Sequence, residues 1–181
     1  MRRSLRNRLL VGTILSTTLI FTLASVVLYH LIRHSLQSEF DAALLARAQS
    51  IASLAEQNSE GIRIDLEPGQ MPEFRTGPHP LYYVLWGQDG QLIASSESCQ
   101  GSNLATTYSQ VSVPERWSRI PLPKGLKGRQ VQLQFTPRME DDEHPVAPTG
   151  RHTAQLLVAG DTQKLDTNIA WMGALLIGVF S

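Results

Sequence analysis

Cysteine is nearly absent from the sequence, and neither sign of charge is in excess. The 181 residues contain one cysteine, Cys99, and carry a formal net charge of zero. A single cysteine cannot form an intrachain disulfide, so we interpret Cys99 as an incidental thiol, with an intermolecular bridge or a redox sensor as the alternatives. Because nucleic-acid-binding proteins usually present a basic face, the charge balance argues against nucleic acid as a partner.

Motifs of catalysis and nucleotide binding are missing as well. The sequence has no Walker motif, no G-x-S-x-G, no H-E-x-x-H and no C-x-x-C. The acidic run from Glu140 to His144, with His152 nearby, contains ligands suited to a hard cation but lacks the spacing and the glycine of a calcium loop. We therefore predict a solvated acidic loop there, and no catalytic residue, metal site or cofactor in this chain.

Charge is absent from residues 9–32, a run of 24 residues without Asp, Glu, Lys or Arg. As a helix this run is about 36 Å long, enough to cross a hydrocarbon core of about 30 Å. Four arginines in residues 1–8 predict a cytoplasmic N-terminus, which places residues 33–168 outside the cytoplasm, in the periplasm. A cleaved signal peptide is the alternative, but the apolar run is too long for a signal core.

Residues 169–181 are again free of charge and carry an interfacial type of residue, Trp171, near their start. Thirteen residues are too few to span a bilayer. We expect the start of a second membrane-spanning helix that is cut short, with a buried C-terminal helix as the alternative.

Proline and glycine are absent between residues 13 and 60, so one helix can continue from the membrane into the domain as far as Asn58. Arg47 lies on the apolar face of this helix, where either a snorkelling stem or a contact with a partner or ligand accounts for it. Six residues form the predicted apolar stripe: Leu36, Phe40, Ala43, Leu44, Ile51 and Leu54.

After residue 61 the apolar residues alternate with a period of two, which predicts strands. Asp89-Gly90 lies between two of them and predicts a tight hairpin with positive φ angles. Val131, Leu133 and Phe135 alternate with glutamines, which predicts one buried and one wet face. One long helix followed by five or six antiparallel strands predicts an α+β fold. The predicted strands are residues 62–66, 82–86, 91–95, 117–122, 130–136 and 154–159.

Aromatic and cationic side chains gather near the junctions of predicted loops and strands. Such groups suit a small anion, although strand aromatics more often belong to a core. We take five residues as candidate ligand contacts: Arg75, His79, Tyr82, Tyr83 and Arg116.

Three stretches, taken in order, resemble one known family. They are Phe40-Asp41-Ala42-Ala43-Leu44-Leu45-Ala46-Arg47-Ala48, Trp86-Gly87-Gln88-Asp89-Gly90-Gln91-Leu92-Ile93-Ala94-Ser95-Ser96, and Leu157-Val158-Ala159-Gly160-Asp161-Thr162 followed by Leu165. They resemble the first helix, the central hairpin and the last strand of the N-terminal sensor region of bacterial two-component sensor histidine kinases. These are features of fold and not of catalysis.

The resemblance implies a PAS-like periplasmic sensor domain, a homodimer, and a cytoplasmic kinase that autophosphorylates on histidine and acts on a response regulator. No linker helices, phosphoacceptor histidine or ATP-binding lobe follow Ser181. We therefore expect a fragment or a truncated product that is no kinase by itself. ATP and Mg would belong only to the missing kinase part.

The leading hypothesis is thus a signal-input module of the inner membrane, in which two copies of the apolar stripe pair in parallel and carry the signal. A stand-alone membrane-tethered interaction protein and the input domain of another receptor, such as a chemoreceptor or a nucleotide cyclase, are the alternatives. A periplasmic enzyme is disfavoured by the missing motifs.

Overall fold

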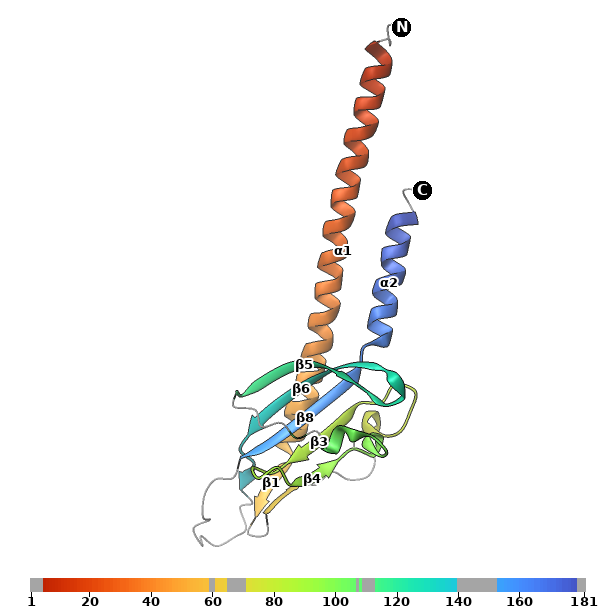
Figure 1. Cartoon of the computed structure of the whole chain (residues 1–181). Coiled ribbons are helices and arrows are strands. Elements are labelled where there is room, and N and C mark those ends of the chain that lie inside the picture. Colours follow the sequence, from red (N-terminus) through yellow and green to blue (C-terminus); the bar gives the residue numbers. More distant parts are fainter. Residues whose placement is uncertain are drawn as a thin grey trace. The chain divides into compact units, whose positions relative to one another are not determined.

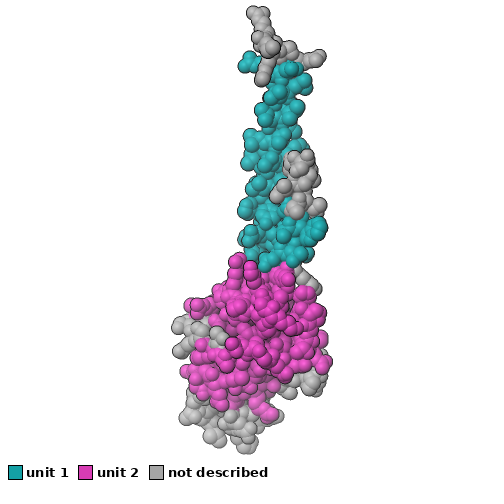
Figure 2. Space-filling model, turned by 45° about the vertical axis from the view of Figure 1, so that its right-hand side comes forward, with its two compact units in different colours: residues 1–39, 165–181 teal, residues 40–164 magenta. Residues whose placement is uncertain are grey.

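The structure is a computed structural model that divides into two compact units (Figure 2), one of residues 1–39 with 165–181 and one of residues 40–164. The acidic run from Glu140 to His144, His152, and the first two arginines, Arg2 and Arg3, lie outside the described residues. The described residues are 5–58, 61–64, 71–106, 108, 113–139 and 153–178.

The first unit contains most of helix α1 (Leu5–Ser53) and of helix α2 (Gln163–Gly178). By length and composition α1 is able to cross a membrane, and its most apolar stretch is unburied, which confirms the predicted long apolar helix. Inside this unit Tyr29 and Ile32 of α1 approach Ile169 and Met172 of α2, and Ile169 is buried. The second membrane span stays a prediction.

Helix α1 ends at Ser53, so the predicted extension to Asn58 is wrong. The next residues form a strand in which Ala55 and Gln57 are buried and Glu56 is exposed. Pairing on both sides stabilises this strand over a helix, although its residues are compatible with either. The resulting small sheet has the order β2 (Gly61–Ile64), β1 (Ala55–Asn58) and β7 (Arg138–Met139), with β1 antiparallel to β2 and parallel to β7.

The larger sheet has five strands, each antiparallel to its neighbours (Figure 1). Its order is β4 (Leu92–Ser95), β3 (Tyr82–Trp86), β8 (Ala154–Asp161), β6 (Lys127–Phe135) and β5 (Glu115–Pro121). Short 3-10 helices lie in the connections at Pro72–Phe74, Glu97–Cys99, Asn103–Thr106 and Pro123–Gly125. The α+β class is confirmed. The predicted strand 82–86 agrees with β3 at both ends.

Both faces of the larger sheet are covered. On the first face the end of α1 packs through Leu44, Ala48 and Ile51, against Leu85, Val131, Leu156 and Val158. On the second face the segment after β4, residues 96–106, packs through Cys99 and Leu104. It lies against Tyr82, Val84, Trp86, Leu157 and Ala159. The central strand β8 is therefore buried from Ala154 to Gly160, as expected for a strand that reads as a continuous apolar run.

The predicted wet face of residues 130–136 is wrong. Gln130 and Gln132 are only 8% and 6% exposed. Gln130 Nε2 donates to Ser118 Oγ at 2.8 Å on the neighbouring strand, so its amide is partly satisfied inside the domain. The alternation correctly separated the two faces of the strand, but it could not reveal that the second face is also covered.

The predicted apolar stripe of α1 is rotated relative to the observed one. Leu44 and Ile51 are buried in the domain core, whereas Ala43 is exposed. Ala48, which the stripe omitted, is fully buried. Leu36, Phe40 and Leu54 are partly buried. Pairing of two copies along α1 stays a prediction.

The hairpin around Asp89-Gly90 is confirmed, with a wider turn than the predicted one. Gly90 N donates to Gly87 O at 3.0 Å, and Gly87 N donates to Gln91 O at 2.9 Å. Gly90 has φ +79°, while the φ of Asp89 is not positive. The pairing register shifts between Leu85 and Trp86. One glycine in the left-handed region therefore closes the turn, together with a bulge in the pairing.

Substituting Gly90 by Val should lower the free energy of unfolding by about 1 kcal/mol or more, because a β-branched residue resists positive φ. A Cβ at Gly90 would also lie 3.0 Å from Tyr108 Cδ1. Chemical denaturation measures the effect. Gly77→Val is the matched control, since Gly77 has open space around it and should change by less than about 0.5 kcal/mol. Equal stabilities of the two variants would show that this turn is not strained.

Candidate functional site

The two tyrosines among the five candidate ligand residues lie on opposite faces of the sheet. They are consecutive on β3, and successive side chains of a strand point to opposite faces. Tyr82 is buried in the second-face cluster with Cys99 and Leu104. Tyr83 is partly buried against the first-face cluster, with its ring edge-on to Phe74 at 5.2 Å between centroids. Both rings therefore belong to the packed domain.

The three cationic candidates lie in two further places. Arg116 is exposed on the edge strand β5. Arg75 and His79 are exposed in one connection, residues 75–81, which we call the bridging segment. The structure thus brings only Arg75 and His79 into one segment, and the ligand-binding role of all five residues stays a prediction.

Arg47, the cation within the stripe, turns back along its own helix. Its Nη1 donates to the carbonyl of Ala43 at 3.1 Å, and its Nε lies 3.6 Å from Glu73 Oε1. The contact between Arg47 and Glu73 is an ion pair, because 3.6 Å is too long for a hydrogen bond.

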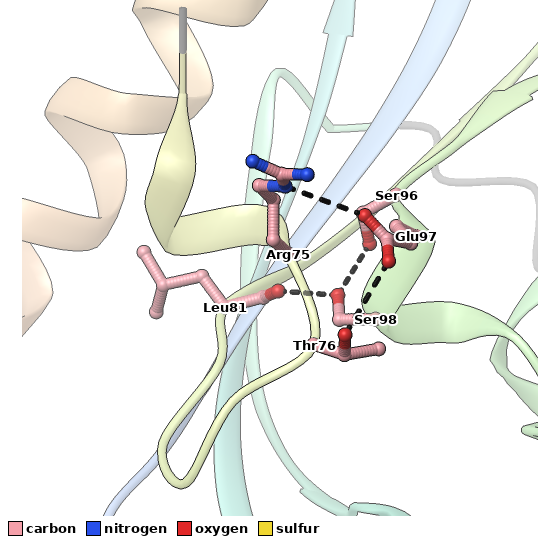
Figure 3. Close-up of polar contacts among 6 residues, drawn as sticks. All are labelled: Arg75, Thr76, Leu81, Ser96, Glu97 and Ser98. Atoms are coloured by element: carbon pink, nitrogen blue, oxygen red, sulfur yellow. Dashed lines mark hydrogen bonds and ion pairs between the residues drawn. The ribbon is translucent and has the colours of Figure 1, made fainter. Parts of the chain in front are cut away.

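The bridging segment is tied to the residues that follow β4 (Figure 3). One carboxylate oxygen of Glu97 accepts a hydrogen bond from Thr76 Oγ1 at 3.3 Å, and the other lies 3.6 Å from Arg75 Nε. Ser98 Oγ donates to the carbonyl of Leu81 at 2.6 Å. Both ends of the bridging segment are therefore held by Glu97 and Ser98.

The inner side of this contact is a buried network of small polar groups. Ser96 Oγ lies 2.7 Å from Ser98 Oγ and 3.2 Å from Cys99 Sγ, and it accepts from Tyr83 N at 3.1 Å. The network forms because the chain turns directly after β4 into a 3-10 helix, in which Cys99 N donates to Ser96 O at 3.0 Å. Its side chains thus satisfy one another next to the strand end.

Burial raises the pKa of the Cys99 thiol, against the lowering effect of its hydrogen bonds to Ser96 and Tyr83. Cys99 is therefore protonated at neutral pH, which does not favour a thiolate nucleophile. Burial also raises the pKa of Tyr82, with smaller contributions from the charges of Cys99 and Asp161. The pKa of Tyr83 is raised by burial and by Cys99. These shifts keep all three groups neutral.

Through His79 the bridging segment contacts the last residue of β8, Asp161. His79 Nδ1 lies 2.9 Å from Asp161 Oδ2, and the Asp161 side chain is only 3% exposed. The other carboxylate oxygen of Asp161 accepts from Gln163 N at 2.7 Å. Gln163 is the first residue of α2. One buried carboxylate therefore joins the bridging segment to the first helical residue, as a capping group does.

An ion pair joins α1 to the same end of the sheet. Arg129 of β6 donates to Asp41 of α1 through Nε at 2.5 Å and through Nη2 at 2.7 Å, and its guanidinium lies 5.3 Å from the Trp117 ring. In the sheet register Arg129 is opposite Gly160, next to Asp161. Arg129 of β6 thus holds α1 through Asp41, and Asp161, at the neighbouring position of β8, holds the first residue of α2.

Sequence reasoning missed Asp41, Arg129, Asp161 and Ser98. Asp41 and Asp161 lie in two of the stretches that carry the family resemblance, and this was the one sequence signal available for finding them. Arg129 and Ser98 stand in polar runs with no distinguishing spacing. Among the residues that the structure describes, no group of three or more His, Cys, Asp or Glu side chains is placed to hold a metal ion.

A family model described as two-component sensor kinase N-terminal matches residues 17–136. The matched range contains the end of α1, the bridging segment and strands β1 to β6. No curated protein and no solved structure gives a significant match.

Proposed function

We propose that this chain, which belongs to the two-component sensor kinase N-terminal family, is a membrane-anchored input module that senses a periplasmic stimulus for a cytoplasmic kinase. The family implies a response regulator as the partner of the complete kinase. The observation that carries the proposal is that one end of the sheet binds both helices. Arg129 binds Asp41 of α1, and Asp161 accepts a hydrogen bond from Gln163 N of α2. An input module needs a stimulus-dependent domain that contacts the helices leading to its output.

The domain is proposed to be PAS-like. The support is a five-stranded antiparallel sheet in which the hairpins β3–β4 and β5–β6 flank the central strand β8. One face is covered by α1, and the other by the segment after β4. Such a layered domain leaves its loops free to take different ligands on one scaffold.

Residues 33–168 are proposed to lie in the periplasm and residues 1–8 in the cytoplasm. The support is the exposure of the apolar part of α1, for which a lipid environment removes the unfavourable contact with water. The arginines of residues 1–8 set the direction. Residues 169–181 are proposed to begin a second span.

Alkaline phosphatase, which is active only outside the cytoplasm, should be active when it is fused after Asn58 of the chain. A fusion after Arg8 is the matched control and should be inactive, because no apolar run precedes it. Colony assays of both fusions measure the result. An inactive Asn58 fusion that is present in the membrane would reverse the topology and exclude a periplasmic input module.

Two copies of the chain are proposed to pair along α1. Leu44 and Ala48 are buried in the chain's own core, so we place the contact on the opposite, exposed face instead of on the stripe predicted from the sequence. Four exposed residues with heptad-like spacing form that face: Ala42, Ala46, Gln49 and Ser53. Three of the four, Ala42, Ala46 and Ser53, have small side chains, which allow two helices to approach closely.

Single cysteines introduced at Ala42, Ala46, Gln49 and Ser53 in a Cys99→Ser background should cross-link in native membranes. Cysteines at Leu44 and Ala48 are the matched controls and should not cross-link, since the core covers them. The yield along the helix should rise and fall with a period of about 3.6 residues. A flat yield, or peaks at the buried positions, would contradict the parallel pairing.

A further inference from the structure

We infer that the bridging segment, residues 75–81, is a mechanical link that transmits displacement of the segment after β4 to the first residue of α2. The inference deepens the proposed function and rests on it for its biological meaning, because it names the route from an input surface to the second helix. The route itself is a property of the domain of residues 40–164 and is measurable without any kinase output.

The first step of the route is the hold of the segment after β4 on the bridging segment. Ser98 Oγ donates to the carbonyl of Leu81 at 2.6 Å, and Ser98 is buried. Ser98 is also fixed to Ser96 at 2.7 Å, within the network that contains Cys99. Because Cys99 packs on the second face of the sheet, a shift of this segment moves Ser98 and the carbonyl that it holds.

The second step is the contact of His79 with Asp161. A carboxylate only accepts hydrogen bonds, so the hydrogen lies on His79 Nδ1. The pair is 2.9 Å apart, and the carboxylate is almost entirely shielded from solvent. Removing the donor would leave a buried carboxylate with one partner fewer, which destabilises its present position. His79 therefore fixes where Asp161 points.

The third step is the contact of Asp161 with Gln163 N at 2.7 Å. The first amides of a helix have no partner inside the helix, so they depend on a group such as this carboxylate. Leu81 completes the connection by packing, since its Cδ2 lies 2.9 Å from where a Cβ of Gly160 would stand. The bridging segment thus contacts the last two residues before Thr162 through both His79 and Leu81.

Hydrogen exchange at the amide of Gln163 tests the route in the full chain, held in lipid nanodiscs and read by mass spectrometry with electron-transfer fragmentation. His79→Ala should raise the exchange rate of this amide by about tenfold, the usual worth of a hydrogen bond to a charged group. Ser98→Ala should raise it by about threefold, as expected for a neutral hydrogen bond. In the double variant Ser98→Ala should add nothing, because its effect passes through His79.

Two variants separate the link from a general loss of stability. His79→Asn keeps a donor near the position of Nδ1 and should restore slow exchange. Asp89→Ala is the matched control, because it removes a carboxylate bond to Gln91 N in the distant β3–β4 turn and should leave Gln163 unchanged.

Four outcomes would each overturn the link. Two concern Ser98→Ala: no effect by itself, or an effect that multiplies with that of His79→Ala in the double variant. The others are failure of His79→Asn to restore slow exchange and an effect of Asp89→Ala equal to that of His79→Ala. None of these outcomes bears on the membrane topology, so the proposed function would stand or fall separately on the phosphatase fusions.

Discussion

The close packing at Gly160 is the constraint on which the rest of the domain depends. A Cβ there would lie 2.9 Å from Leu81 Cδ2, 3.1 Å from Phe40 Cζ and 3.4 Å from Leu44 Cδ1. Only a residue without a side chain lets α1 and the bridging segment meet on the central strand. Because β8 is buried on both faces, this meeting point is set at the end of the best-packed element of the domain.

The ion pair next to Gly160 differs in kind from those elsewhere in the described structure. The Arg129–Asp41 pair is bidentate, with side chains 27% and 23% exposed, and such charge-assisted bonds contribute on the order of 1–3 kcal/mol. The Arg75–Glu97 pair is 3.6 Å long and largely exposed, and exposed pairs contribute about 0–1 kcal/mol. The bidentate pair thus holds α1 to the sheet more strongly than the Arg75–Glu97 pair holds the first residue of the bridging segment.

Local chemistry was enough to predict some parts of this fold. Asp89-Gly90 between apolar runs predicted the hairpin, and the uninterrupted apolar run predicted α1. Strand β1 could not be predicted, because residues 55–58 suit a helix until β2 and β7 pair with them. The contacts of the site could not be predicted from the sequence either. Asp41 and Arg129 are 88 residues apart, and His79 and Asp161 are 82 residues apart. No periodicity relates such positions.

The most direct test of the central claim, that both helices are held at the end of β8, is one substitution read at two places. Hydrogen exchange of the full chain carrying Gly160→Val, in lipid nanodiscs, compares residues 40–48 of α1 with Gln163 of α2. Valine suits a strand backbone, so the change acts through its contacts with Phe40 and Leu81. The account predicts faster exchange at both places, with Asp89→Ala, in the β3–β4 turn, unchanged as the control. Faster exchange at only one of them, or at neither, would contradict it.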